Sequence, residues 1–379
     1  MFQTLWSVPL TGDGIAGLVV ADGKLIVSDR DAFDTSDIWR CLDAETGEEI
    51  WMLTYSQPGR LDYGNSPRAT PVIDLNNNRV FLLSAFGLMH AVDFETGDIL
   101  WRQNVVRSFG GTIPIWGIST SPILADGKLI VSPGGNDAAL AALDPANGEV
   151  IGKTPAATPA EQTGYASPLV ATFDGVEQVI LYGERSLFGV ELATGNRLWE
   201  HRPRRSGDFN VPTPFAVGNR LFVTTENNGS RLYEFDGTGK IKEPFIAQHD
   251  ELSPDTSTPV MIDGKIFGVW HDLFVLDADS LRPLASYSDE GLSGYVMLIA
   301  GKTSSRQTYL LTVSERGVVL LWRVNGDECV IVDRSQPLGD ADMLAHPALV
   351  GDVLYLRNVN GIAALRFEYT FGDSSLVFL

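Results

Sequence analysis

One turn motif returns along the whole of this chain and constrains its fold more than any other feature. The motif is Asp-Gly-Lys or a close variant, and a short β-rich run follows each of its eight copies. In most copies a second turn, of the form Asp-x-x-Thr-Gly, comes about twenty residues later. A motif that recurs through an entire sequence indicates that one supersecondary unit has been copied and that neighbouring copies bury one another.

The first turn of each repeat joins two apolar runs, such as Leu18-Val19-Val20 and Leu25-Ile26-Val27. Its residues tolerate positive φ, and this combination predicts a β-hairpin. The eight copies are Asp22-Gly23-Lys24, Asn76-Asn77-Asn78, Asp126-Gly127-Lys128, Asp174-Gly175, Gly218-Asn219-Arg220, Asp263-Gly264-Lys265, Gly301-Lys302 and Gly351-Asp352.

The second turn separates a third apolar stretch from a fourth. A tryptophan stands four residues after the turn glycine in three copies, as Trp51, Trp101 and Trp199, and Gly152 and Glu243 take its place in two others. Large aromatic side chains at a fixed outer position are suited to wedging one repeat against the next. The second turns are Asp43-Ala44-Glu45-Thr46-Gly47, Asp93-Phe94-Glu95-Thr96-Gly97, Asp144-Pro145-Ala146-Asn147-Gly148, Glu191-Leu192-Ala193-Thr194-Gly195 and Asp236-Gly237-Thr238-Gly239, with weaker copies at Asp277-Ala278-Asp279-Ser280 and Asn325-Gly326.

A Ser or Thr followed by Pro marks the first strand of most repeats. Proline cannot donate to a sheet, so it belongs where the chain joins the sheet. The seventh repeat has Tyr295 at the Ser/Thr position and no proline. The marked pairs are Thr70-Pro71, Ser121-Pro122, Ser167-Pro168, Thr213-Pro214, Thr258-Pro259 and, in the eighth repeat, His346-Pro347.

Four strands in roughly 45 residues is the length of one propeller blade. The predicted fold is therefore an all-β, eight-bladed propeller of four-stranded antiparallel blades that forms a single domain over 1–379; a seven-bladed ring is the alternative. We expect the N-terminal strand around Thr4 to Val8 to complete the last blade and close the ring. In a competing version Ser375 to Leu379 supply that strand. The approximate blades are 15–55, 69–104, 120–154, 167–201, 211–245, 258–287, 294–333 and 343–379 with 3–10.

Composition excludes several classes of function. The formal net charge of −20 would repel a phosphate backbone, so we expect no nucleic-acid partner. No apolar run approaches the roughly 20 residues of a membrane span, and the N-terminus lacks the pattern of a secretory signal. Cys41 and Cys329 fall in blades that are not neighbours, so we predict no disulfide between them. We expect a monomer.

The repeated string Val92-Asp93-Phe94-Glu95-Thr96-Gly97-Asp98-Ile99-Leu100-Trp101 resembles the quinoprotein alcohol dehydrogenase-like, or PQQ-like, repeat of bacterial β-propellers. The stretches Trp116-Gly117-Ile118-Ser119-Thr120-Ser121-Pro122 and Gly164-Tyr165-Ala166-Ser167-Pro168 resemble it as well. The resemblance covers nearly the entire chain. It implies the propeller fold and a periplasmic or exported setting, although the missing signal leaves the cytoplasm open.

The superfamily that the repeat resembles includes PQQ- and calcium-dependent dehydrogenases and also non-enzymatic members such as the lipoprotein of the outer-membrane β-barrel assembly machine. In the dehydrogenases adjacent cysteines cover the quinone, a tryptophan lies beneath it, and Glu, Asn and Asp hold calcium. This chain has no adjacent cysteines and nearly minimal repeats. We therefore expect no cofactor and no metal, with PQQ and calcium as the alternative.

A site in a propeller is expected where the loops that lead into the innermost strands converge on the central channel. These loops are 55–69, 104–120, 155–166, 202–212, 244–257, 287–295 and 335–346. Their aromatic, amide and charged side chains could stack on and hydrogen-bond a sugar, a peptide or a quinone, or could cap strand ends and bind water. The candidate ligand-binding residues are Tyr63, Asn65, Arg68, Trp116, Tyr165, Asn210, Asp255, Tyr295, Asp340, Asp342 and His346.

His346 is the most unusual candidate, because five other repeats have Ser or Thr at its position. Beside Asp340 or Asp342 it could accept a proton or bind a metal, or it could be structural. Asp74-Leu75-Asn76-Asn77-Asn78 imitates the start of a calcium loop but lacks the glycine and the distal glutamate, so we interpret it as a turn.

No sequence motif assigns catalytic residues, because nucleophile elbows, phosphate loops and zinc-protease motifs are all missing from the sequence. The leading hypothesis is a non-catalytic binding or scaffolding module that holds a protein or small ligand at the channel mouth. The alternative is a PQQ- and calcium-dependent dehydrogenase of alcohols or sugars. A second alternative is a carbohydrate-binding or carbohydrate-active protein.

Overall fold

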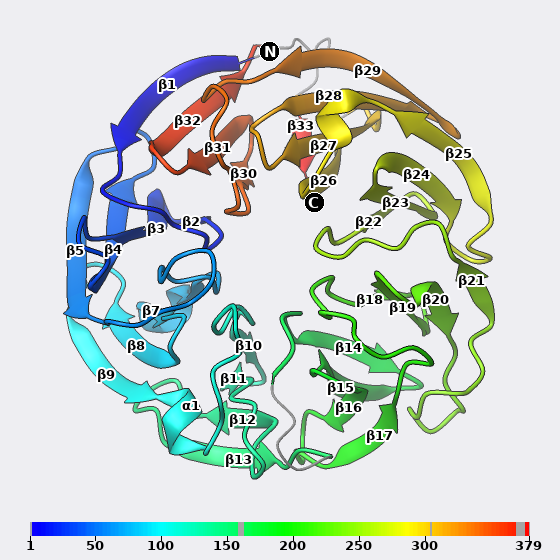
Figure 1. Ribbon diagram of the computed structural model, residues 1–379, viewed down its shortest axis with the longest axis horizontal. Helices are drawn as coiled ribbons and strands as arrows, with labels where there is room; N and C mark the ends of the chain where they lie inside the picture. The colour runs from blue at the N-terminus through cyan, green and yellow to red at the C-terminus, as the bar shows by residue number, and fades with distance from the viewer. Residues whose placement is uncertain (1, 158–162, 304, 369–375, 379) are drawn as a thin grey trace.

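Eight antiparallel sheets surround a central channel in the computed structural model (Figure 1), which describes residues 2–157, 163–303, 305–368 and 376–378. Seven sheets have four strands and one has five. The predicted eight-bladed, all-β propeller is therefore confirmed. Within the described residues, no helix is long and apolar enough to cross a membrane.

The first four blades follow the chain from the channel outward. Blade 1 contains β2 (Val19–Ala21), β3 (Lys24–Arg30), β4 (Ser36–Asp43) and β5 (Glu49–Ser56). Blade 2 contains β6 (Val72–Asp74), β7 (Arg79–Leu83), β8 (Leu88–Asp93) and β9 (Ile99–Asn104). Blade 3 contains β10 (Ile123–Ala125), β11 (Lys128–Val131), β12 (Leu140–Leu143) and β13 (Val150–Thr154). Blade 4 contains β14 (Leu169–Phe173), β15 (Val176–Tyr182), β16 (Leu187–Glu191) and β17 (Arg197–His201).

The other four blades repeat this arrangement, with one addition at each end of the chain. Blade 5 contains β18 (Phe215–Val217), β19 (Arg220–Thr225), β20 (Gly229–Tyr233) and β21 (Ala247–His249). Blade 6 contains β22 (Val260–Ile262), β23 (Lys265–Trp270), β24 (Asp272–Asp277) and β25 (Pro283–Ser288). Blade 7 contains β26 (Val296–Thr303), β27 (Thr308–Ser314), β28 (Val319–Asn325), β29 (Glu328–Ser335) and β33 (Leu376–Phe378). Blade 8 contains β30 (Ala348–Val350), β31 (Val353–Asn358), β32 (Gly361–Phe367) and β1 (Phe2–Pro9).

Both turns of the repeat have the conformations that their residues favour. In the first turn, Asp22 and Gly23 have φ values of 45° and 71°, as a two-residue hairpin requires. In the second turn, the Asp43 carboxylate accepts hydrogen bonds from the backbone N–H groups of Glu45 and Thr46 at 2.9 and 2.8 Å. Gly47 then ends the turn with a φ of 75°. Local hydrogen bonding and positive φ thus favour these turns within each blade.

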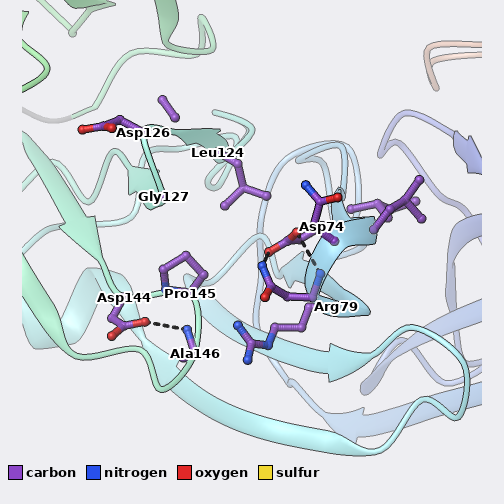
Figure 2. A pocket seen from close by; sticks show the side chains of 13 residues that line it. Asp74, Arg79, Leu124, Asp126, Gly127, Asp144, Pro145 and Ala146 are labelled. Atoms are coloured by element: carbon purple, nitrogen blue, oxygen red, sulfur yellow. Dashed lines mark hydrogen bonds between the residues drawn. The ribbon is translucent and has the colours of Figure 1, made fainter.

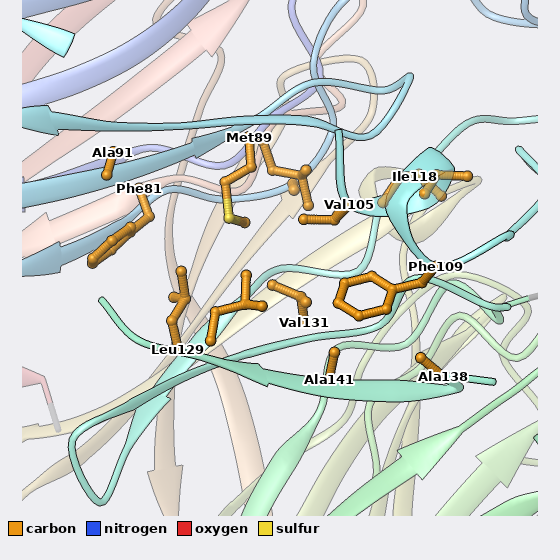
Figure 3. Packing of buried hydrophobic residues seen from close by; sticks show 14 residues of the cluster. Phe81, Met89, Ala91, Val105, Phe109, Ile118, Leu129, Val131, Ala138 and Ala141 are labelled. Carbon is orange, nitrogen blue, oxygen red and sulfur yellow. The ribbon is translucent and has the colours of Figure 1, made fainter. Parts of the chain in front are cut away.

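The predicted aromatic wedge between blades is present. The Trp51 indole N–H of blade 1 donates to the Phe94 carbonyl of blade 2 at 3.0 Å, and Trp101 donates to the Pro145 carbonyl of blade 3 at 3.0 Å. The Trp51 ring lies so close to Gly97 that a Cβ there would be 2.7 Å from it. Apolar side chains of adjacent blades, such as Phe81 and Leu129, fill the space between the sheets (Figure 3).

The Ser/Thr positions that precede the inner strands are joined from blade to blade around the channel. The Thr70 backbone N–H donates to the Ser121 hydroxyl at 3.0 Å, and the Ser121 N–H donates to the Ser167 hydroxyl at 3.1 Å. The same bond links Ser167 to Thr213 and Thr213 to Thr258. These hydroxyls therefore satisfy backbone donors at the inner edges of blades 2 to 5.

The N-terminal strand closes the ring, as predicted. β1 pairs with β32 from Phe2 opposite Phe367 to Pro9 opposite Gly361. The competing version, in which the last residues close blade 8, is wrong, because β33 pairs with the inner strand β26 of blade 7. The N-terminal strand β1 is therefore the outermost strand of blade 8.

In the described part of the chain, three short helices lie between the strands and were not predicted. They are the 3-10 turns η1 (Leu75–Asn77) and η2 (Glu290–Leu292) and the single helical turn α1 (Val105–Ser108). Asp74 caps η1, which confirms that this segment is a turn. In α1, Val105 and Val106 are buried with the core between blades 2 and 3.

Candidate functional site

The propeller has two faces of different construction. The four strands of a blade alternate in direction, so both turns of the repeat lie on one face, which we call the turn face. The loops that join consecutive blades lie on the other, which we call the loop face, together with the loops between second and third strands. All sequence-predicted site residues belong to loop-face segments.

Four aromatic side chains meet on the loop face, and we call them the aromatic cluster. The Trp116 ring centroid lies 4.5 Å from that of Phe209, 5.1 Å from that of Tyr165 and 6.4 Å from that of Tyr63. The four residues come from four consecutive interblade loops. Tilted and edge-to-face contacts at these distances are favourable for aromatic rings, so the cluster is a preformed surface.

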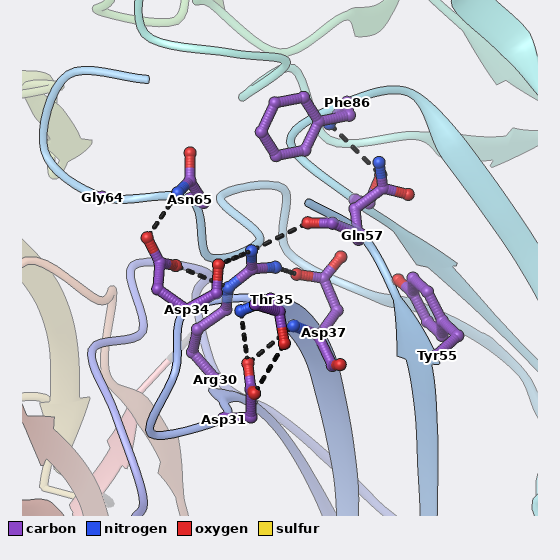
Figure 4. A network of polar contacts seen from close by, with 12 residues as sticks. Arg30, Asp31, Asp34, Thr35, Asp37, Tyr55, Gln57, Gly64, Asn65 and Phe86 are labelled. Carbon is purple, nitrogen blue, oxygen red and sulfur yellow. Dashed lines mark hydrogen bonds and ion pairs between the residues drawn. The ribbon is translucent and has the colours of Figure 1, made fainter. Parts of the chain in front are cut away.

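Arg30, at the end of β3, fixes the loop that carries Tyr63 (Figure 4). Its guanidinium donates to the carbonyl oxygens of Asp34 and Gln57 at 2.9 and 2.8 Å. The Asn65 side-chain amide donates to the Asp34 carboxylate. Tyr63 is held between these anchors with a φ of 61°. The predicted site residue Asn65 therefore positions the loop and is buried.

α1 and the turn after it position Trp116. The buried side chains of Val105 and Val106 anchor α1 between blades 2 and 3. The Gly117 backbone N–H donates to the Pro114 carbonyl at 2.8 Å and closes a turn with Trp116 at its corner. Gly117 has a φ of 71°, a conformation that glycine adopts without strain.

Asn210 positions Tyr165 from the next interblade loop. Its carbonyl accepts hydrogen bonds from the backbone N–H groups of Tyr165 and Ala166 at 3.2 and 2.8 Å. Its side-chain amide donates to the carbonyl oxygens of Gly183 and Glu184 at 2.8 and 3.0 Å. Asn210 is buried and has a φ of 55°, which asparagine tolerates better than most residues. Like Asn65, it is a structural part of the site.

Arg68 holds a buried positive charge next to Tyr165. It is 9% exposed, and its guanidinium donates to the carbonyl oxygens of Asp62 and Gly64, each at 2.7 Å. Its Nε has no hydrogen-bond partner among the described residues. Burial lowers the pKa of Arg68 to about 10, so it stays charged at neutral pH, and burial raises the pKa of the Tyr165 hydroxyl.

Apolar side chains around the aromatic cluster are unusually exposed for a folded protein. Phe33 is 87% exposed, Tyr63 is 72% and Ile115 is 64%. Ile113 and Phe209 are exposed as well. Phe33 belongs to the β3–β4 loop that contains Asp34, and the others belong to the interblade loops of the aromatic cluster. The Asp34 carboxylate binds Asn65 of the Tyr63 loop, and we call the exposed apolar side chains of these neighbouring loops the apolar patch of the loop face.

Tyr295 and His346 form a separate pair where the Ser/Thr ring is interrupted. The Tyr295 hydroxyl and His346 Nε2 are 2.6 Å apart. His346 is accessible to solvent, yet the surrounding channel wall lowers its pKa by hindering solvation of the charged ring. Among the described residues no hydrogen bond joins His346 to Asp340 or Asp342. Both carboxylates bind Arg316, at 2.8 and 2.6 Å.

Asp255 does not join either group. It accepts a hydrogen bond from the Thr256 hydroxyl at 3.0 Å, and in the described part of the chain no hydrogen bond links it to another predicted site residue. Phe209, Ile115 and Phe33, by contrast, are site residues that sequence reasoning missed. A usable signal existed, because each is a large apolar residue in a segment expected to be a surface loop.

PQQ and calcium, the alternative cofactors, would need metal-ligating side chains that converge on one point. Within residues 2–157, 163–303, 305–368 and 376–378, no group of three or more His, Cys, Asp or Glu could hold a metal ion. Calcium requires six to eight oxygen ligands. Cys41 and Cys329 are free, buried and in blades 1 and 7, as the prediction of no disulfide requires. The described residues thus contain neither a cluster of three such ligands nor a pair of adjacent cysteines.

Comparison with known proteins gives two kinds of relative. A polyvinylalcohol dehydrogenase from Pseudomonas sp is 25% identical in an alignment of 236 residues, with a coverage of 47% of this chain and 37% of the enzyme. The chain thus spans little more than a third of that enzyme. BamB from Moraxella catarrhalis superposes with a TM-score of 0.66 at 16% identity, covering 97% of this chain and 100% of that one.

A quinohemoprotein alcohol dehydrogenase from Comamonas testosteroni superposes with a TM-score of 0.64 at 13% identity, covering 96% of this chain and 76% of the enzyme. At such identities, structural likeness shows the fold alone. The family model described as outer membrane protein assembly factor BamB matches residues 34–280 of this chain. Because that match covers well over half of its 379 residues, the chain belongs to this family of PQQ-like β-propellers.

Proposed function

We propose that this protein is a non-catalytic binding module that holds another protein against the apolar patch of its loop face. It works without a resident cofactor and in a periplasmic or exported setting. The observation that carries the proposal is the aromatic cluster around Trp116, whose flanking side chains Tyr63 and Ile115 are mostly exposed.

An exposed apolar patch of this kind favours a protein partner over a small molecule. Small molecules bind in concave pockets that bury most of their surface. Here Phe33, Tyr63 and Ile115 project from the molecule with most of their surface exposed. Protein interfaces concentrate their binding energy in clustered aromatic and arginine side chains, and Trp and Tyr are enriched among them. The cluster would therefore supply the anchor of an interface, and the loops around it the polar rim.

The family description suggests which partner to seek. A match to outer membrane protein assembly factor BamB supports a role in assembling outer-membrane proteins, with a protein component of that machinery as the partner. The negative net charge makes a nucleic-acid partner improbable on physical grounds.

Site-specific crosslinking tests the proposal. A photoreactive phenylalanine at Tyr63 should capture a protein in living cells of the source organism, whereas the same group at the exposed Met52 of β5 should not. Trp116→Ala should weaken binding of the captured partner at least about tenfold, because truncating a hot-spot aromatic costs about 2 kcal/mol or more and tenfold corresponds to about 1.4 kcal/mol. Equal capture from both positions, or unchanged binding by the variant, would contradict the proposal.

The second candidate is a PQQ-dependent dehydrogenase, which the match over 236 residues to polyvinylalcohol dehydrogenase favours. Purified protein would be incubated with PQQ and calcium, and its thermal unfolding and dye-linked oxidation of alcohols and aldoses measured. Saturable stabilisation together with turnover would replace the binding-module proposal. We expect neither, because the described residues do not provide the donor set.

A further inference from the structure

The turn face carries an ion pair that recurs between adjacent blades. A basic residue at the start of a second strand reaches the acidic residue two positions into the second turn of the next blade. Lys24 pairs with Glu95 at 2.8 Å, and Lys265 pairs with Asp327 at 3.6 Å. Arg220 pairs with Asp279 in the same way. The repeat therefore has a defined place for a carboxylate opposite this basic residue.

Between blades 2 and 3 the carboxylate is missing. Arg79 opens β7 at the position of Lys24, but the equivalent of Glu95 in the next turn is Ala146. No ion pair or side-chain hydrogen bond of Arg79 occurs among the described residues, although the side chain is half-buried. Figure 2 shows Arg79 extending toward the turn that carries Ala146. Arg79 thus lacks, among the described residues, the acidic partner that the repeat provides at three other interfaces.

A pocket of about 480 Å³ opens at this interface, within the size range of small-molecule sites. Two local departures from the repeat create it. The Ala146 side chain is too short to reach the position of the missing carboxylate. The 3-10 turn η1 also replaces the tight hairpin turn of other blades. Apolar side chains from both blades, including Ile73, Leu124 and Pro145, form part of the lining.

Three carboxylates share the lining with Arg79, and all are partly satisfied. Asp74 accepts from the Asn77 side chain at 2.8 Å, Asp126 pairs with Lys128 at 2.5 Å, and Asp144 accepts from the Ala146 backbone N–H at 2.7 Å. A simple anion would pair with one guanidinium in a pocket whose lining also contains three carboxylates. A simple cation would leave Arg79 unpaired. A ligand with both charges can satisfy the two sets of groups.

We propose that this turn-face pocket binds a small zwitterion. The ligand carboxylate pairs with Arg79 in place of the missing acidic side chain. Its cationic group faces the carboxylates of Asp126 and Asp144, and its apolar body lies against Leu124 and Pro145. The site is on the face opposite to the apolar patch, so it does not depend on the proposed protein-binding function.

Three probes with the same five-carbon chain test whether both charges are required: 5-aminopentanoate, pentanoate and pentylammonium. Binding to the full chain is measured by ligand-observed NMR at low ionic strength. The zwitterion should bind at least about fivefold more tightly than either singly charged probe, since an added ion pair contributes about 1 kcal/mol at a partly exposed site. If the zwitterion binds no better than the singly charged probes, or does not bind, the proposal is overturned.

Two substitutions that introduce a glutamate locate the site. Ala146→Glu restores the acidic residue of the repeat opposite Arg79 and should reduce affinity for 5-aminopentanoate at least about fivefold while the protein stays folded. Thr238→Glu places a glutamate at the corresponding turn position of blade 5, opposite the uncharged Val176, and should leave affinity unchanged. Equal affinity in wild type and Ala146→Glu would show that the probe binds elsewhere and would overturn the assignment.

Discussion

At the scale of single residues, His90 is a buried histidine whose ring is packed but not hydrogen-bonded. Its side chain is fully buried, and its ring centroid lies 4.3 Å from that of Tyr55. Neither ring nitrogen has a hydrogen-bond partner among the described residues. Burial, with a smaller contribution from Arg102, lowers the pKa of His90 to about 4. The fold therefore accepts this histidine only in its neutral form.

His90→Phe should make the protein less sensitive to acid. The unfolded histidine has a pKa near 6.5, so between pH 6.5 and 4 the unfolded chain binds more protons than the folded one. Stability from this source is complete above pH 6.5 and falls as the pH drops toward 4. The variant lacks this loss, so its free energy of unfolding relative to wild type should rise by about 2 kcal/mol between pH 7 and 5.

Denaturant unfolding of both proteins at each pH measures this difference. The comparison must be made at matched pH, because Asp37 acts in the opposite direction. Burial, opposed by Arg30, raises the pKa of Asp37 to about 6, so its protonation favours the folded state as the pH falls from 6 to 4. If the unfolding free energies of the two proteins change in parallel with pH, His90 does not titrate as described.

Single residues also mark the limit of what the sequence predicts about the site. The loop positions of Tyr63, Trp116 and Tyr165 follow from the repeat, and these three side chains do meet. Their partners do not follow from it. Asp342 binds Arg316 and not His346, because side-chain pairs across the channel mouth depend on loop conformations that no repeat position specifies.

At the scale of strands and turns, the contact between a tryptophan and a turn glycine joins one blade to the next. Trp51 covers Gly97 and Trp101 covers Gly148 in the same way. Gly195 lacks such a cover, and no described residue lies within 4 Å of a Cβ built there. The cause lies in the preceding blade, where Gly152 takes the position of the tryptophan. The chain thus contains its own comparison between covered and uncovered turns.

Gly97→Ala should destabilise the protein more than Gly195→Ala. Both glycines have φ values near 75°, so each substitution strains the backbone by about 1–2 kcal/mol. At Gly97 the new methyl group would also lie 2.7 Å from the Trp51 ring, and overpacking of this kind costs about 1–3 kcal/mol more. Denaturant unfolding of the two variants measures the difference. Equal losses would mean that the indole moves aside at little cost.

Strand-level features were the most predictable part of the fold, because the repeat supplies eight independent samples of them. Turns, strand order and the wedging tryptophans all follow from the sequence. The short helix α1 does not, since a single turn carries no helical periodicity. Hydrogen bonds from one blade to the next, such as that from Thr70 to Ser121, were also beyond prediction, because they depend on how neighbouring blades are set against each other.

At the scale of the whole molecule, blade 8 closes the ring with the same kind of contact that joins the other blades. The Trp6 indole donates to the Ala44 carbonyl at 3.1 Å, and Gly47 lies against the Trp6 ring. The Tyr355 hydroxyl also reaches the Ala44 carbonyl at 3.1 Å, and the buried Arg357 donates to the Gly12 carbonyl at 3.1 Å. The sequence predicted closure by the N-terminal strand but not the position of β33, which lies outside the repeat pattern.

Removing β1 should destabilise the ring, and restoring it by another connection should repair it. A chain that begins at Leu10 lacks Trp6 and leaves the edge of β32 unpaired, so we expect a loss of at least about 3 kcal/mol in unfolding free energy. In a circular permutant, residues 2–9 follow Phe367 through a copy of the Asp43–Gly47 turn. This connection matches the other blades, because Phe2 lies beside Phe367 in the antiparallel pair.

A chain ending at Phe367 but retaining residues 2–9 is the control for the loss of β33. The permutant should match that control in thermal and denaturant unfolding, since closure depends on the strand and not on its place in the sequence. A permutant as unstable as the deletion would show that the N-terminal connection itself, and not the fourth strand of blade 8, holds the ring closed.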